Sequence, residues 1–90
     1  RAIIDLYRYG TVGEKYNIGG ECELRNIDLV RRIINLMDAD EKLIKFVDDR
    51  PGHDLRYAID NSKIKNAVDF YPRYDIKTGL RKTISWYENN

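Results

Sequence analysis

The sequence predicts an α+β fold, in which short strands mix with three or four helices. Three observations support this class. Apolar residues recur at helical spacing in two long segments, and short runs rich in β-branched and aromatic residues are bounded by glycine, proline or aspartate. The chain has 90 residues, 42% of them apolar, which is enough for at most one small domain.

Residues 1–10 show the apolar spacing of a helix from their first residues onward. Apolar side chains stand at positions 3, 4, 6 and 7 with no capping residue before them, and Gly10 follows where a helix C-terminus favours a left-handed residue. We therefore expect residues 1–10 to be the end of a truncated helix. A frayed N-terminus is the alternative.

Three short strands are expected. The first, residues 15–18, is stopped by the glycine pair Gly19-Gly20, the second covers residues 43–47, and the third covers residues 56–59.

The clearest helix is expected over residues 27–37. Its apolar residues recur at helical spacing, polar residues fill the opposite face, and Asn26 stands at the N-cap position.

Two more helices are expected nearer the C-terminus. Asp60 or Asn61 caps a brief helix that runs through about Val68. Pro72 then interrupts the pattern, and residues 75–87 form a terminal helix with one apolar side.

The charge balance argues against one class of protein, the general nucleic-acid binders. Sixteen basic residues against fifteen acidic ones give a net charge of +1, whereas a general nucleic-acid binder carries a strong basic excess.

No apolar run approaches the roughly 20 residues of a membrane span, and no signal peptide opens the chain. The single cysteine, Cys22, excludes an internal disulfide and fits a reducing compartment, so we expect a cytoplasmic location.

No catalytic, metal or cofactor site is expected within these 90 residues. One histidine and one cysteine cannot build a tetrahedral zinc site. No glycine-rich loop is present to cradle a dinucleotide or a nucleoside triphosphate. None of the seven tyrosines has a lysine four residues later, the spacing at which a cation lowers the pKa of a phenol on the same helical face.

The segment around Pro51-Gly52 is dense in potential anion-binding groups. Arg50, His53 and Arg56 cluster around this turn. A guanidinium suits phosphate oxygens through its planar fork of donors, and an imidazole can donate to phosphate or sugar oxygens. The alternative is a solvated turn in which the arginines pair with Asp48, Asp49 and Asp54.

Residues 50–60, Arg-Pro-Gly-His-Asp-Leu-Arg-Tyr-Ala-Ile-Asp, resemble the signature near the C-terminus of the dTDP-glucose 4,6-dehydratases. These enzymes are members of the extended short-chain dehydrogenase/reductase family. Residues 12–20 resemble the family's upstream strand and turn, and residues 62–64 and 79–87 resemble its closing helices. The Arg-Pro-Gly-His-Asp string favours the dehydratases over the family's epimerases and decarboxylases, which are the nearest alternative.

The resemblance implies that residues 1–90 are the small C-terminal lobe that binds the nucleotide sugar. It places the NAD site and the Tyr-x-x-x-Lys pair in an N-terminal Rossmann domain, which this chain lacks. The complete enzyme, a homodimer, is a lyase that oxidises dTDP-glucose at C4, eliminates water across C5 and C6, and returns the hydride to C6. The lobe alone is expected to be inactive. A non-catalytic nucleotide-binding or interaction module is a further alternative.

The resemblance assigns three substrate-binding residues. Arg50 matches the arginine that reaches the diphosphate, His53 matches the histidine that lies against the nucleotide, and Asn26 matches an asparagine that helps to bind the nucleotide portion. An N-cap alone would also account for Asn26. Residues 21–23, Glu-Cys-Glu, depart from the His-Asn-Glu of many relatives, which would alter nucleotide preference if that loop touches the ligand.

Overall fold

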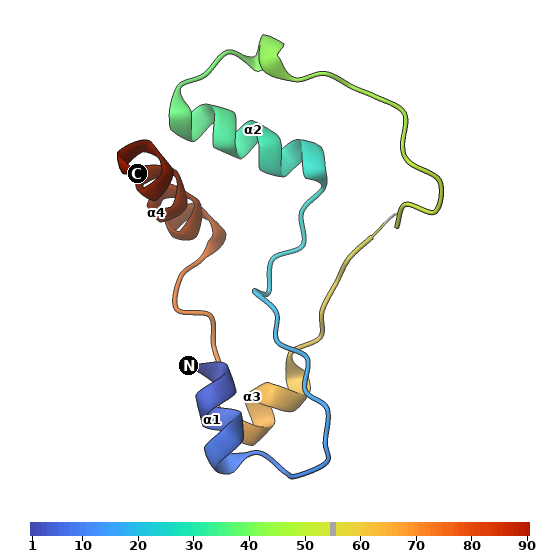
Figure 1. Cartoon of the computed structure of the whole chain (residues 1–90), viewed down its shortest axis with the longest axis vertical. Helices are drawn as coiled ribbons and strands as arrows, with labels where there is room; N and C mark the ends of the chain where they lie inside the picture. The colour runs from blue at the N-terminus through green and yellow to red at the C-terminus, as the bar shows by residue number, and fades with distance from the viewer. Residues whose placement is uncertain (55) are drawn as a thin grey trace. The chain divides into compact units, whose positions relative to one another are not determined.

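The computed structural model describes residues 1–54 and 56–90 (Figure 1). The elements found within these ranges are the α-helices α1 (Ala2–Tyr9), α2 (Asn26–Met37), α3 (Ser62–Val68) and α4 (Ile76–Asn89), and the 3-10 helix η1 (Glu41–Leu43). The chain divides into unit 1 (Arg1–Cys22 and Ala58–Asp75) and unit 2 (Glu23–Tyr57 and Ile76–Asn90). None of the described helices is long and apolar enough to span a membrane.

The prediction of an α+β fold is wrong, because no strand occurs in the part of the chain that the structure describes. Residues 15–18, 44–47 and 56–59 have no regular secondary structure. At residue 43 a local interaction intervenes: the Asp40 carboxylate accepts the Lys42 N–H at 2.9 Å and caps η1. β-branched runs form strands only where a neighbouring strand supplies hydrogen bonds, since β-propensity depends on context.

Unit 1 is built on contacts between α1 and α3. Its buried residues are Ala2 on α1, Ile64 on α3, and Asn61, which precedes α3. The helix expected within residues 1–10 is present, but its apolar residues Ile3 and Tyr7 are 75% and 91% exposed.

Gly10 ends α1 for a reason other than the one predicted. Its backbone is extended, with φ −72° and ψ 163°, rather than left-handed. The Gly10 N–H donates to the Leu6 carbonyl at 2.8 Å, and a Cβ atom at this position would lie only 2.6 Å from that oxygen. Glycine is therefore required by the close approach to Leu6.

The Asn61 side chain joins α3 to a distant backbone segment of unit 1. Its Oδ1 accepts the Gly19 N–H at 2.7 Å, and its Nδ2 donates to the Gly19 carbonyl at 2.6 Å. A Cβ atom on Gly19 would lie 2.9 Å from the Ile59 side chain, so the approach requires glycine. Because the Asn61 amide is hydrogen-bonded to Gly19, it does not cap α3. The Asp60 carboxylate accepts the Ser62 N–H at 2.8 Å instead.

Unit 2 is built on contacts between α2 and α4. Of its described residues none is buried: on α2, Ile33 and Ile34 are half-buried, whereas Val30 and Met37 are exposed. On α4 the half-buried residues include Ile76, Leu80 and Ile84, which belong to the apolar side that the periodicity predicted. The helices of unit 2 therefore agree with the sequence pattern, although they enclose no fully buried core.

Replacing Asn61 by alanine should destabilise the chain. The N–H and carbonyl of Gly19 would lose their partners in a part-buried place, which costs about 1–3 kcal/mol of unfolding free energy. Urea denaturation followed by circular dichroism measures this loss. Asn66→Ala, at an exposed position of α3, is the matched control and should change stability by less than about 0.5 kcal/mol. Equal losses in the two variants would contradict this role of Asn61.

Candidate functional site

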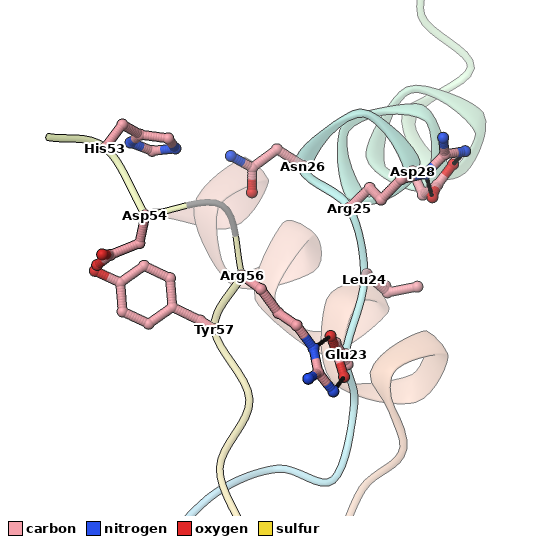
Figure 2. Close-up of a pocket in the computed structure, with 9 residues that line it drawn as sticks. All are labelled: Glu23, Leu24, Arg25, Asn26, Asp28, His53, Asp54, Arg56 and Tyr57. Atoms are coloured by element: carbon pink, nitrogen blue, oxygen red, sulfur yellow. Dashed lines mark hydrogen bonds and ion pairs between the residues drawn. The ribbon is translucent and has the colours of Figure 1, made fainter. Parts of the chain in front are cut away.

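A pocket of about 540 Å³ lies within unit 2 (Figure 2). One wall is formed by the segment that enters α2, and the other by the segment that follows the Pro-Gly turn. The lining residues are Glu23, Leu24, Arg25, Asn26 and Asp28 on the first wall, and His53, Asp54, Arg56 and Tyr57 on the second. Its volume falls in the range of about 300–1,000 Å³ that small-molecule sites occupy.

The first wall is ordered by an ion pair at the start of α2. Arg25 occupies the N-cap position, and its guanidinium donates to both carboxylate oxygens of Asp28, at 2.8 and 3.1 Å. This hydrogen bonding lowers the pKa of the Asp28 carboxyl and raises the pKa of Arg25. The positive charge of Arg25 is therefore balanced within its own helical turn.

Asn26 is the first residue of α2 and not its N-cap, so the sequence prediction is wrong by one position. Within the described chain its side-chain amide makes no capping hydrogen bond. In Figure 2 the amide extends from the first turn of α2 in the direction of the His53 imidazole. The simplest structural explanation for an asparagine here, helix capping, therefore does not apply.

The second wall begins with the predicted turn. The His53 N–H donates to the Arg50 carbonyl at 3.2 Å, and Gly52 adopts a φ of +74°, a left-handed value that favours glycine. His53 is half-buried and lines the pocket. A hydrogen bond to Asp54 raises the pKa of the phenol of Tyr57, an exposed residue.

The two walls are joined by an ion pair between Glu23 and Arg56. The guanidinium donates through Nη2 to Glu23 Oε2 at 2.8 Å and through Nε to Oε1. This hydrogen bonding lowers the pKa of the Glu23 carboxyl and raises the pKa of Arg56. The residues are 33 positions apart, so no local spacing in the sequence could have revealed the pair.

The structure brings two of the three predicted site residues to one pocket. Asn26 and His53 line opposite walls, whereas Arg50 is not among the lining residues and is linked to His53 through the backbone of the turn. The ion pairs of the alternative interpretation, between the arginines of this segment and Asp48, Asp49 or Asp54, are not found among the described residues. Arg56 pairs with Glu23 instead.

Several pocket residues were missed by the sequence analysis. Glu23, Arg25, Asp28 and Tyr57 were not predicted to lie at the site. The spacing of Arg25 and Asp28, three residues apart at a helix start, is a recognisable signal for an ion pair. The sequence carries no comparable signal for the position of Tyr57.

The described lining residues supply groups that can bind a polar ligand. The pocket offers an amide, an imidazole and a phenol as hydrogen-bonding groups. Its described lining residues include no serine, threonine, cysteine or lysine. Among the described residues no cluster of histidine, cysteine and carboxylate side chains could hold a metal ion. A polar small molecule is the ligand class that such a lining fits.

Comparison with known proteins gives consistent results. A family model described as GDP-mannose 4,6 dehydratase matches residues 6–83. The whole chain is 48% identical to the dTDP-glucose 4,6-dehydratase of Escherichia coli and 47% identical to a probable dTDP-glucose 4,6-dehydratase of Sinorhizobium fredii. It spans 28% of the length of each of these relatives.

A solved structure shares the fold. The crystal structure of dTDP-glucose 4,6-dehydratase from Bacillus anthracis str. Ames in complex with NAD matches 99% of this chain with a TM-score of 0.91 and 46% identity, and the match covers 28% of that protein. The resemblance seen in residues 50–60 is thereby confirmed. Because the family model matches most of its residues, this chain belongs to the GDP-mannose 4,6-dehydratase family.

Proposed function

We propose that this chain is the nucleotide-sugar-binding lobe of a dTDP-glucose 4,6-dehydratase. Such an enzyme converts dTDP-glucose to dTDP-4-keto-6-deoxyglucose with bound NAD. The observation that carries the proposal is the pocket of unit 2, which has Asn26 on one wall and His53 on the other. The whole-chain identity to enzymes named for this substrate supports the same ligand.

Arg50 is the residue proposed to bind the diphosphate. Three arginines lie in or next to the pocket, and two of them, Arg25 and Arg56, form ion pairs with carboxylates. In the described part of the chain the Arg50 guanidinium has no ion-pair partner, so its fork of donors is available to phosphate oxygens. Its place in the turn that also holds His53 would let both side chains reach one ligand.

His53 and Asn26 are proposed to bind the nucleotide portion. Both present hydrogen-bond donors from the pocket walls. Asn26 also stands at the N-terminus of the twelve-residue helix α2, where the helix dipole favours a negatively charged group. The lobe would thus bind and orient the substrate, which lowers a reaction barrier only when the reacting centre is held as well.

The residues of this chain do not fit NAD. The sequence has no Gly-x-Gly-x-x-Gly fingerprint, the glycine-rich turn that receives the dinucleotide in a Rossmann domain. We therefore assign NAD and the catalytic residues to the remainder of a longer protein.

The proposed context is a two-domain enzyme. Residues 1–90 would be its C-terminal lobe, with α1 as the end of a longer helix, and a Rossmann domain would precede them in a homodimer. The 28% coverage of the relatives is consistent with this arrangement. The free, exposed thiol of Cys22 fits a reducing cytoplasm.

Arg50→Ala should weaken dTDP binding by roughly tenfold to a hundredfold, because a hydrogen bond to a charged group contributes about 1.5–3 kcal/mol. Titration of dTDP into the chain, followed by amide NMR with UDP for comparison, measures this change. In the wild-type chain the shifts should centre on Asn26, Arg50 and His53. Arg81→Ala, which removes the same charge from α4, is the control. Equal effects of the two variants would indicate attraction by net charge and contradict a diphosphate site at Arg50.

Asn26→Asp should separate ligand binding from helix stability. A carboxylate in the first turn of α2 favours the helix by about 0.3–1 kcal/mol, whereas beside a bound diphosphate it repels the ligand. We expect unchanged or higher stability in urea together with weaker dTDP binding than in Asn26→Ala. If Asn26 serves only the helix, the aspartate variant would bind dTDP at least as tightly as the alanine variant.

A further inference from the structure

We propose that the Glu23–Arg56 ion pair is a positioning clamp, which holds the segment leading to Asn26 against the segment carrying His53. The pair does not itself have to touch the ligand. Its part in substrate binding rests on the proposed function, but its part in placing the two walls does not.

The geometry of the pair favours this role. Two parallel hydrogen bonds join the guanidinium to the carboxylate, with Nη2–Oε2 at 2.8 Å. A bidentate contact fixes the orientation of both partners as well as their separation. Glu23 lies shortly before Asn26 in the chain, and Arg56 shortly after His53, so the clamp acts close to both proposed ligand-binding side chains (Figure 2).

The other polar contacts of the pocket are local. The Arg25–Asp28 pair lies within the first turn of α2, and the Tyr57–Asp54 hydrogen bond lies within the second wall. Among the described lining residues, the Glu23–Arg56 pair is the side-chain ion pair that crosses from one wall to the other. The relative placement of the walls therefore depends on it.

The exposure of the pair separates positioning from general stability. The side chains of Arg56 and Glu23 remain 72% and 46% exposed, and exposed ion pairs contribute little to folding. Removing the pair should therefore leave the helices folded while the walls move apart for part of the time. The apparent affinity for dTDP then falls in proportion to the fraction of chains in which the two walls are in place.

The binding test uses dTDP and three variants. Glu23→Gln and Arg56→Lys should each weaken dTDP binding roughly fivefold in amide NMR titrations, which corresponds to the upper range for an exposed pair. The charge-swapped double variant, Glu23→Arg with Arg56→Glu, should recover most of the affinity. Glu41→Gln is the matched control, because it breaks the exposed Arg31–Glu41 pair of unit 2 outside the pocket. Equal dTDP affinity in wild type and both single variants would overturn the clamp.

A ligand-free measurement decides the inference independently. In amide spectra without dTDP, Glu23→Gln should shift the signals of His53, Asp54 and Tyr57, and Arg56→Lys should shift those of residues 23–26. Glu41→Gln should shift neither set. If each variant disturbs only its own sequence neighbours, the clamp is overturned whatever dTDP does. If the cross-wall shifts occur but the wild-type chain does not bind dTDP, the clamp stands and the proposed function fails.

Discussion

The Asn61 amide connects two segments of unit 1 that no strand pairing connects. It gives one hydrogen bond to the Gly19 backbone and receives another, so a single side chain reproduces the exchange of bonds that two strand residues would make. The side chain is only 4% exposed, and each partner would be costly to leave unpaired. The apolar core of this unit is small, since its buried hydrophobic residues are Ala2 and Ile64, so the Asn61 contact adds order that this burial alone does not supply.

In unit 2, polar contacts also hold segments of the chain in position. With no fully buried residue among those described, its loops have little hydrophobic burial to fix them, and polar contacts place them instead. Asp40 sets the turn of η1, Arg25 and Asp28 set the start of α2, and Arg56 and Glu23 join the pocket walls. Directional bonds of this kind specify geometry well, although each contributes only about 1 kcal/mol to stability.

This distribution of interactions explains what could be predicted from the sequence. The helices could be predicted because helical periodicity and breakers such as Pro72 are local features. The prediction of strands was wrong, because strand formation depends on pairing with residues far away in the chain, and residues 15–18 find no partner among the described residues. Asn26 and His53 were named together only through the family resemblance. The link between their walls joins residues 33 positions apart and follows no period.

Charge pairing gives the pocket its proposed selectivity for a diphosphate. A lobe with three unpaired arginines at one site would attract polyanions of many kinds, nucleic acids among them. Asp28 and Glu23 neutralise Arg25 and Arg56, and hydrogen bonding to these arginines lowers the pKa of both carboxyl groups, so both carboxylates stay charged to a lower pH than unpaired acidic side chains do. Arg50 has no ion-pair partner among the described residues and, under the proposed function, lies next to the donors that bind the rest of the ligand. If the proposed function holds, affinity for a nucleoside diphosphate depends on Asn26 and His53 as well as on Arg50, so the position of the two pocket walls matters alongside the charge.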